Sequence, residues 1–158
     1  PNCILVDFLK RQPVALVSFY KNFAIDGQGI LFLPGSPIEA AKLPVIYGLE
    51  TKIFAPRPGV RYKRPELGLA LNILKEFKAN KTFQGFDLKR IDVPDLESAS
   101  FFMQSEWFGF EVRTGEGNIR QKLMILGGLV MQARQEWGNI KYIDLRFKEP
   151  LIKLKNAK

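Results

Sequence analysis

Two segments of this chain keep apolar residues at the three- and four-residue spacing of an amphipathic helix over several turns. The first opens at Pro65, a residue suited to the first helical position, and stops near Asn80. The second follows Asn118, whose side chain can cap a helix N-terminus, and ends at Gly138, where a helix C-terminus favours positive φ. The two predicted apolar stripes are Leu67, Ala70, Leu71, Leu74 and Phe77, and Ile119, Leu123, Leu126, Val130, Ala133 and Trp137.

The rest of the chain consists of short apolar runs that are broken by proline, glycine and charged turns. Asp26-Gly27-Gln28 between two such runs indicates a hairpin, because glycine accepts positive φ. In the last long run, Ile143, Leu145 and Phe147 share one face, and Tyr142, Asp144 and Arg146 share the other. The predicted strands are 3–9, 14–20, 23–25, 29–32, 43–48, 86–93, 100–104, 107–113, 140–147 and 151–155.

Most of these runs are joined by short turns, so antiparallel pairing should dominate. The sequence therefore predicts an α+β fold, a mostly antiparallel multi-stranded sheet with two amphipathic helices packed on one face. No apolar run reaches the roughly 18 residues of a membrane-spanning helix. The chain begins at Pro1 without a methionine, and we interpret it as a fragment of a longer protein.

Residues that carry catalytic chemistry are scarce. The chain has no histidine, and its one cysteine, Cys3, can form neither an internal disulfide nor a structural zinc site. The closest carboxylate pairs are Asp92 with Asp95 and Glu97 with Glu106, and they stand beside prolines and turn residues. We therefore predict a protein that is not an enzyme, with no catalytic, cofactor-binding or metal-binding residue.

The formal net charge is +8, from 24 basic and 16 acidic residues. The positive residues are scattered along the chain, which favours a solvated basic surface. Charge together with phenylalanines on predicted strands leaves an alternative function, a basic nucleic-acid-binding α+β module.

Five stretches in the same order resemble the FtsQ/DivIB family of bacterial cell-division proteins. The most specific is Ile143-Asp144-Leu145-Arg146-Phe147, which is close to that family's Ile/Val-Asp-Leu-Arg-Tyr/Phe signature. The others are residues 6–15, 23–32, 43–48 and 112–129. The chain departs from the family pattern at Lys148-Glu149-Pro150, where relatives often carry glycine or small polar residues.

The resemblance implies a non-catalytic divisome scaffold, the extracytoplasmic part of a single-pass inner-membrane protein whose membrane helix is not in this sequence. Residues 1–12 would be the end of a POTRA (polypeptide-transport-associated) domain or a linker strand, and residues 13–158 the β domain. The expected partners are FtsB/DivIC-like and FtsL-like division proteins, with no nucleic acid and no cofactor.

In this family the partner adds a strand near the C-terminal edge of the sheet. The last predicted strand suits that role, because an edge strand offers unpaired backbone groups for β-augmentation. Arg146 would offer a planar fork to a carboxylate of the partner. Phe147 could anchor the partner or belong to the core. The expected partner-binding residues are Arg146, Phe147, Glu149, Leu151, Ile152 and Lys153.

Overall fold

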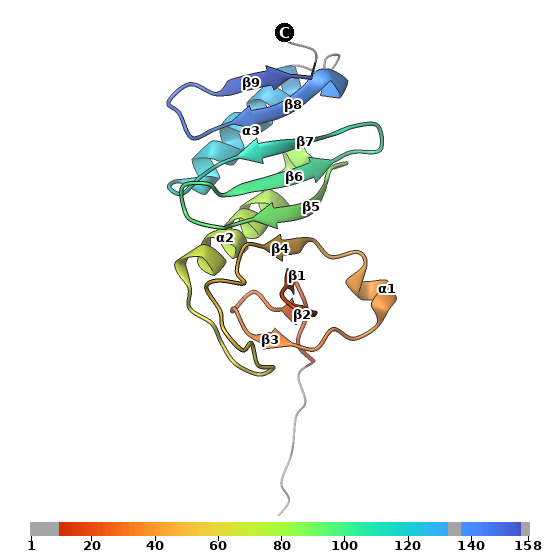
Figure 1. The fold of residues 1–158 in the computed structure, drawn as a ribbon. Coiled ribbons are helices and arrows are strands. Elements are labelled where there is room, and N and C mark those ends of the chain that lie inside the picture. The colour runs from red at the N-terminus through yellow and green to blue at the C-terminus, as the bar shows by residue number, and fades with distance from the viewer. Residues whose placement is uncertain (1–9, 133–136, 156–158) are drawn as a thin grey trace, which may run out of the picture.

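The computed structural model describes residues 10–132 and 137–155, and the strand predicted at 3–9 lies outside them. Nine strands in these residues form a single sheet in the order β3-β2-β1-β4-β5-β6-β7-β8-β9 (Figure 1). The strands are β1 (Ala15–Ser18), β2 (Asn22–Ile25), β3 (Leu31–Phe32), β4 (Val45–Tyr47), β5 (Asp87–Asp92), β6 (Ser100–Gln104), β7 (Gly109–Arg113), β8 (Ile140–Asp144) and β9 (Leu151–Leu154). The helices are α1 (Pro37–Ala40), α2 (Pro65–Ala79) and α3 (Ile119–Gln132), with short 3₁₀ turns η1 (Lys81–Phe83) and η2 (Trp137–Asn139).

Most neighbouring strands pair antiparallel, as the short turns predicted. The exceptions are β1–β4, β4–β5 and β7–β8, which pair in parallel. Two of these parallel pairs are strand–helix–strand units, because α2 connects β4 to β5 and α3 connects β7 to β8. A parallel neighbour needs such a crossover connection. The predicted α+β class, with a mostly antiparallel sheet, is confirmed.

The helices α2 and α3 lie side by side behind the sheet, over the same face (Figure 1). Helix α2 buries its predicted apolar stripe with Ile73 in place of Leu71, and α3 buries the part of its predicted stripe from Ile119 to Val130. Phe77 of α2 stacks on Phe83 with 4.8 Å between the ring centroids and meets Phe101 of β6 edge-on. The contact with Phe101 ties α2 to an interior strand of the sheet. None of the described helices has the length and apolar character that crossing a membrane requires.

The predicted end of the second helix is wrong. Ala133 lies outside the described residues, and Trp137 belongs to η2 rather than to α3. Trp137 is buried, and its ring stacks on Phe110 at 5.2 Å and on Phe108 at 6.2 Å. The indole is thus fixed by β7 as the chain enters β8, and Gly138 does not adopt the positive φ that a helix-ending glycine would need.

Candidate functional site

The two edges of the sheet are exposed to different degrees. At the β3 edge, residues 59–62 return along the strand, with Leu31 N–H donating to Val60 O at 3.1 Å and Gly59 N–H donating to Leu31 O at 2.7 Å. At the other edge, β9 pairs with β8, and no other strand among the described residues pairs with it. Within residues 10–132 and 137–155 the sheet therefore has one covered edge and one open edge, and the predicted edge position of the last strand is confirmed.

The direction of the free backbone groups on β9 follows from its register. Lys155 N–H donates to Asn139 O at 2.7 Å, toward β8. Because the hydrogen-bonding direction alternates along a strand, Lys153 and Leu151 also face β8, while Ile152 and Leu154 direct their N–H and C=O groups outward. Two residues of β9 can therefore pair with an added strand without any change in the existing ladder.

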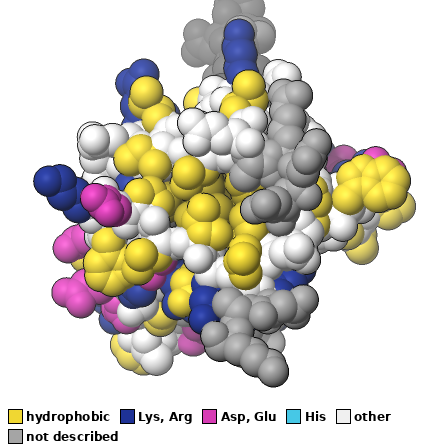
Figure 2. All heavy atoms as spheres, turned by 90° about the horizontal axis from the view of Figure 1, so that it is seen from above, with side chains coloured by type: hydrophobic (Ala, Val, Ile, Leu, Met, Phe, Trp, Pro, Cys, Tyr) yellow, Lys and Arg dark blue, Asp and Glu magenta, His cyan; other side chains and the backbone are white. Residues whose placement is uncertain are grey.

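The side chains of β9 are exposed along its whole length. Leu151, Ile152 and Leu154 are the apolar ones, and Ile152 is 46% exposed. Figure 2 looks onto the molecule from the β9 end and shows hydrophobic side chains gathered in the middle of that view. Lys153 is exposed between these residues, so the strand combines apolar surface with positive charge.

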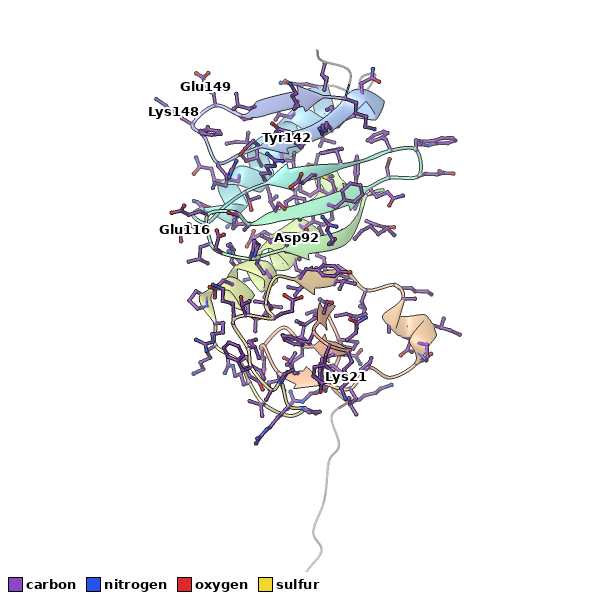
Figure 3. The ribbon with its side chains drawn as sticks, viewed as in Figure 1. Lys21, Asp92, Glu116, Tyr142, Lys148 and Glu149 are labelled. Atoms are coloured by element: carbon purple, nitrogen blue, oxygen red, sulfur yellow. The ribbon has the colours of Figure 1, made fainter. Side chains whose placement is uncertain are left out.

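The turn between β8 and β9 contains three of the six expected contact residues, namely Arg146, Phe147 and Glu149. The strand predicted through residue 147 ends at Asp144, and Arg146 to Glu149 form a bend. Phe147 is 57% exposed, so the alternation that made it a possible core residue does not extend this far. Figure 3 shows Lys148 and Glu149 at the outer tip of this turn. The six expected contact residues thus lie on one continuous stretch at the open edge.

Arg146 is held in place by Asp144. Arg146 Nε lies 2.9 Å from Asp144 Oδ1, and Nη2 lies 2.6 Å from Oδ2. The hydrogen bonds from the Arg146 side chain hold the pKa of the Asp144 carboxyl below its usual value, although burial acts in the opposite direction. The same pairing raises the pKa of Arg146. The guanidinium also lies 5.9 Å from the centre of the Phe147 ring.

A hollow of about 350 Å³ adjoins this turn and was missed by the sequence reasoning. It is lined by Arg146 and Phe147 on one side and by the β7–α3 turn on the other. Lys122 of α3 donates to Thr114 O at 2.5 Å and to Glu116 O at 2.7 Å, and burial lowers its pKa. Lys122 lies outside the apolar stripe of α3, so its position in the sequence does not predict that it binds the backbone carbonyls of the β7–α3 turn.

The acidic residues considered for catalysis occupy structural or solvated positions. Asp92 pairs with Arg90 at 2.7 Å, and Asp95 accepts a hydrogen bond from Ser98 N–H, which lowers the pKa of Asp95. Glu106 is exposed, and Glu97 lines the hollow beside Arg146. In residues 10–132 and 137–155, no group of three or more metal-ligating side chains comes together.

Comparison with known proteins assigns the chain to a family. A family model described as "Cell division protein FtsQ/DivIB, C-terminal" matches residues 15–146. The chain is 29% identical to a "Cell division protein FtsQ" of Anaeromyxobacter sp. (strain K) over 148 residues, which are 92% of this chain and 49% of that protein. It is 23% identical to a "Cell division protein FtsQ" of Geotalea daltonii over 152 residues, which are 96% of this chain and 54% of that protein.

The chain therefore spans about half the length of the curated relatives it matches. The matched region runs from the first residue of β1 through β8 to Arg146, so it includes most of the sheet and both long helices. The chain belongs to the FtsQ/DivIB family of cell division proteins, in the C-terminal region that the family model describes.

Proposed function

We propose that this chain is a non-catalytic scaffold of bacterial cell division that captures a partner strand along the open edge of β9. The partner would be an FtsB/DivIC-like division protein, with an FtsL-like protein in the same complex, and the assembly would help control septal peptidoglycan synthesis. The observation that carries the proposal is the contrast between the two sheet edges, of which one is covered by residues 59–62 and the other is left open by the part of the chain that the structure describes.

The backbone of β9 supports this role. Edge strands with unpaired N–H and C=O groups bind extended segments by β-augmentation, and the main-chain hydrogen bonds supply affinity. Ile152 and Leu154 present both groups outward. A bound strand would extend the sheet by one position beyond β9, next to the apolar surface that Figure 2 shows.

The side chains around the edge support a partner that carries apolar and acidic residues. Phe147 and Ile152 offer exposed apolar contact area. Lys148, Lys153 and Lys155 outnumber Glu149 in this segment, which favours an acidic partner and discourages pairing with basic strands. Arg146 is already oriented by Asp144, so little side-chain entropy would be lost when it meets a carboxylate.

The family assignment supports the placement of this domain in the cell. We propose that residues 13–158 form the β domain, that residues 1–12 belong to the junction with a preceding POTRA domain, and that the domain acts on the extracytoplasmic face of the inner membrane. The family match begins at residue 15, and each of the two relatives is about twice as long as the region it shares with this chain.

The decisive experiment compares two substitutions at one residue. Ile152→Pro removes the side chain and the outward N–H, whereas the matched control Ile152→Ala removes most of the side chain and keeps the N–H. Capture of an FtsB-like peptide should be abolished by Ile152→Pro, reduced by Ile152→Ala and abolished by Phe147→Ala, while circular dichroism reports an intact fold for all three. Unchanged capture by the Ile152→Pro and Phe147→Ala variants would show that the edge strand is not the site.

Binding to nucleic acid is tested in the same assay. A single-stranded oligonucleotide replaces the peptide, and the dependence of the affinity on salt is measured. Phosphate-driven binding weakens linearly on a log–log scale, whereas strand addition depends on backbone pairing and apolar anchors. We expect that the β9 substitutions do not change the capture of the oligonucleotide, in contrast to their effect on the peptide.

A further inference from the structure

A second surface on this molecule has the properties of a docking site and lies on the helices rather than on the sheet edge. Between α2 and α3 is a hollow of about 470 Å³. Its walls come from the C-terminal turn of α2 with the following Lys81, and from the first two turns of α3. The two helices run side by side at this place in Figure 1.

The rim of this hollow is basic. Lys75 of α2, Lys81 and Arg120 of α3 line it, with Glu76 as the carboxylate among its lining residues. All three cations are exposed, and among the described residues none of them forms an ion pair. The rim thus carries positive charge that the described part of the fold does not neutralise.

The hollow also has apolar lining residues, one of which is an exposed methionine. These residues are Ala79, Leu123 and Met124, and Met124 is 65% exposed. Met131 follows Met124 by seven residues, so it lies on the same side of α3 two turns further on, and it is 57% exposed. Flexible methionine side chains at a surface can repack around the side chains of different partners.

The base of the hollow is rigid. Asn80 Nδ2 donates to Leu123 O at 3.3 Å, and the Asn80 carboxamide oxygen accepts from Thr82 N–H at 3.0 Å. The spacing between α2 and α3 is therefore fixed at this point by hydrogen bonds as well as by packing. A hollow between two helices whose spacing is fixed at this point suits a third helix, whose apolar side chains at three- and four-residue spacing would meet Met124 and continue along α3 toward Met131.

We propose that the α2–α3 groove binds an amphipathic helix of a partner protein, with its apolar stripe on Met124 and Met131 and with glutamate or aspartate residues beside Lys75, Lys81 and Arg120. The charge argues for this occupant over a second copy of the chain, because two copies would bring like-charged rims together. The groove is a different surface from the β9 edge, so this inference stands independently of the proposed strand addition.

The three methionines of the chain provide a direct readout. Met103 is fully buried in β6, whereas Met124 and Met131 are exposed on α3, so ¹³C-methyl labelling of methionine gives two reporters and one internal control. The probe is a synthetic helix of about 18 residues, long enough to be populated, with a leucine and alanine stripe flanked by glutamates. A twin peptide carries the same stripe flanked by lysines.

We expect the glutamate peptide to shift the signals of Met124 and Met131, to leave Met103 unchanged and to bind more weakly as salt is raised. The double substitution Lys75→Glu with Arg120→Glu should weaken its binding about tenfold. The control pair Arg57→Glu with Lys63→Glu makes the same change in net charge in the exposed loop before α2, and it should leave the affinity nearly unchanged.

Several results would overturn the proposal. Equal binding of the lysine-flanked twin would show that the rim charge does not select the partner. Shifts of Met124 with phosphatidylglycerol vesicles, but not with the glutamate peptide, would assign the groove to a lipid surface. Concentration-dependent shifts of Met124 in the chain alone, with a dimer in sedimentation, would assign it to a second copy. Because the β9 substitutions leave the groove intact, failure here would be separable from failure of the edge-strand proposal.

Discussion

Asp144 and Arg146 form a two-point ion pair at the place where β8 ends, with Arg146 Nε 2.9 Å from Asp144 Oδ1 and Nη2 2.6 Å from Oδ2. Arg146 N–H also donates to Oδ1 at 3.1 Å, so the carboxylate closes the bend that begins the β8–β9 turn. Asp144 is buried while Arg146 reaches the surface. The pair therefore links the stability of the sheet edge to the orientation of a proposed contact residue.

The first prediction concerns pH. Because the pKa of Asp144 is lower in the folded chain than its ordinary value, the unfolded chain binds more protons in acid. The stability that the pair contributes is present above the ordinary carboxyl pKa of about 3.9 and is lost as pH falls through the folded value. Asp144→Asn should lower the free energy of unfolding by about 1–2 kcal/mol at pH 7. Urea unfolding should show this difference shrinking in acid, and a difference that stays constant down to pH 2 would contradict the account.

The second prediction concerns the β2–β3 turn. Asp26 is buried and accepts from Gln28 N–H at 2.9 Å, from Ile30 N–H at 3.0 Å and from Arg11 Nη1 at 2.7 Å. Burial raises the pKa of Asp26, but these hydrogen bonds outweigh it and leave the pKa lowered.

Asp26→Ala leaves two backbone donors without their acceptor and should cost about 1–3 kcal/mol in thermal or urea unfolding. Arg11→Ala removes only the half-exposed partner and should cost less than about 1 kcal/mol. Equal costs for the two variants would mean that the salt bridge, rather than the turn, supplies the stability.

The third prediction sets two glycines against each other. Gly48 has φ 89°, and a Cβ there would lie 2.6 Å from Pro94 N, so Gly48→Ala should destabilise the fold by about 2 kcal/mol or more. Gly128 is exposed in the middle of α3, and a Cβ there would meet nothing within 4 Å. Gly128→Ala should therefore stabilise the chain by about 0.5–1 kcal/mol. Calorimetric melting temperatures that move in the same direction for both variants would contradict the structure.

The fourth prediction compares the two tryptophans of the chain. Trp137 is buried between Phe108 and Phe110, whereas Trp107 is exposed at the β6–β7 turn. Trp137→Ala should cost about 3–5 kcal/mol, and Trp107→Ala should change stability by less than about 0.5 kcal/mol. Denaturant titrations of both variants test this, and a tolerated Trp137→Ala would show that η2 does not anchor β8.

The sequence predicted the parts of this fold that depend on local pattern. The start of α2 at Pro65 and its end beside Asn80 are confirmed, because the helical stripe and its terminal residues are adjacent in the chain. The turn at Asp26-Gly27 is confirmed for the same reason. The edge position of β9 agrees with its lysine-rich pattern, because charged side chains protect an edge strand from indiscriminate pairing.

The features that the sequence did not reveal depend on contacts between distant residues. The two-residue period of a strand does not show which strand pairs with it, so the sequence does not predict the parallel pairing of β4 with β1 and β5. The order strand–helix–strand around α2 is nevertheless a signal that favours the parallel β4–β5 pair. The early end of β8 was missed because it results from the closure of the bend by Asp144 and Arg146. Phe147 then follows the bend instead of the strand alternation, which explains its exposure.

Amide hydrogen exchange of β9, measured with and without an FtsB-like peptide, tests the central claim most directly. An added strand would use the outward N–H groups of Ile152 and Leu154, so their exchange should slow by about tenfold or more when the peptide binds, while the buried Val17 of the interior strand β1 should not change. Peptide binding that leaves the exchange of Ile152 and Leu154 unaltered would contradict strand addition at β9.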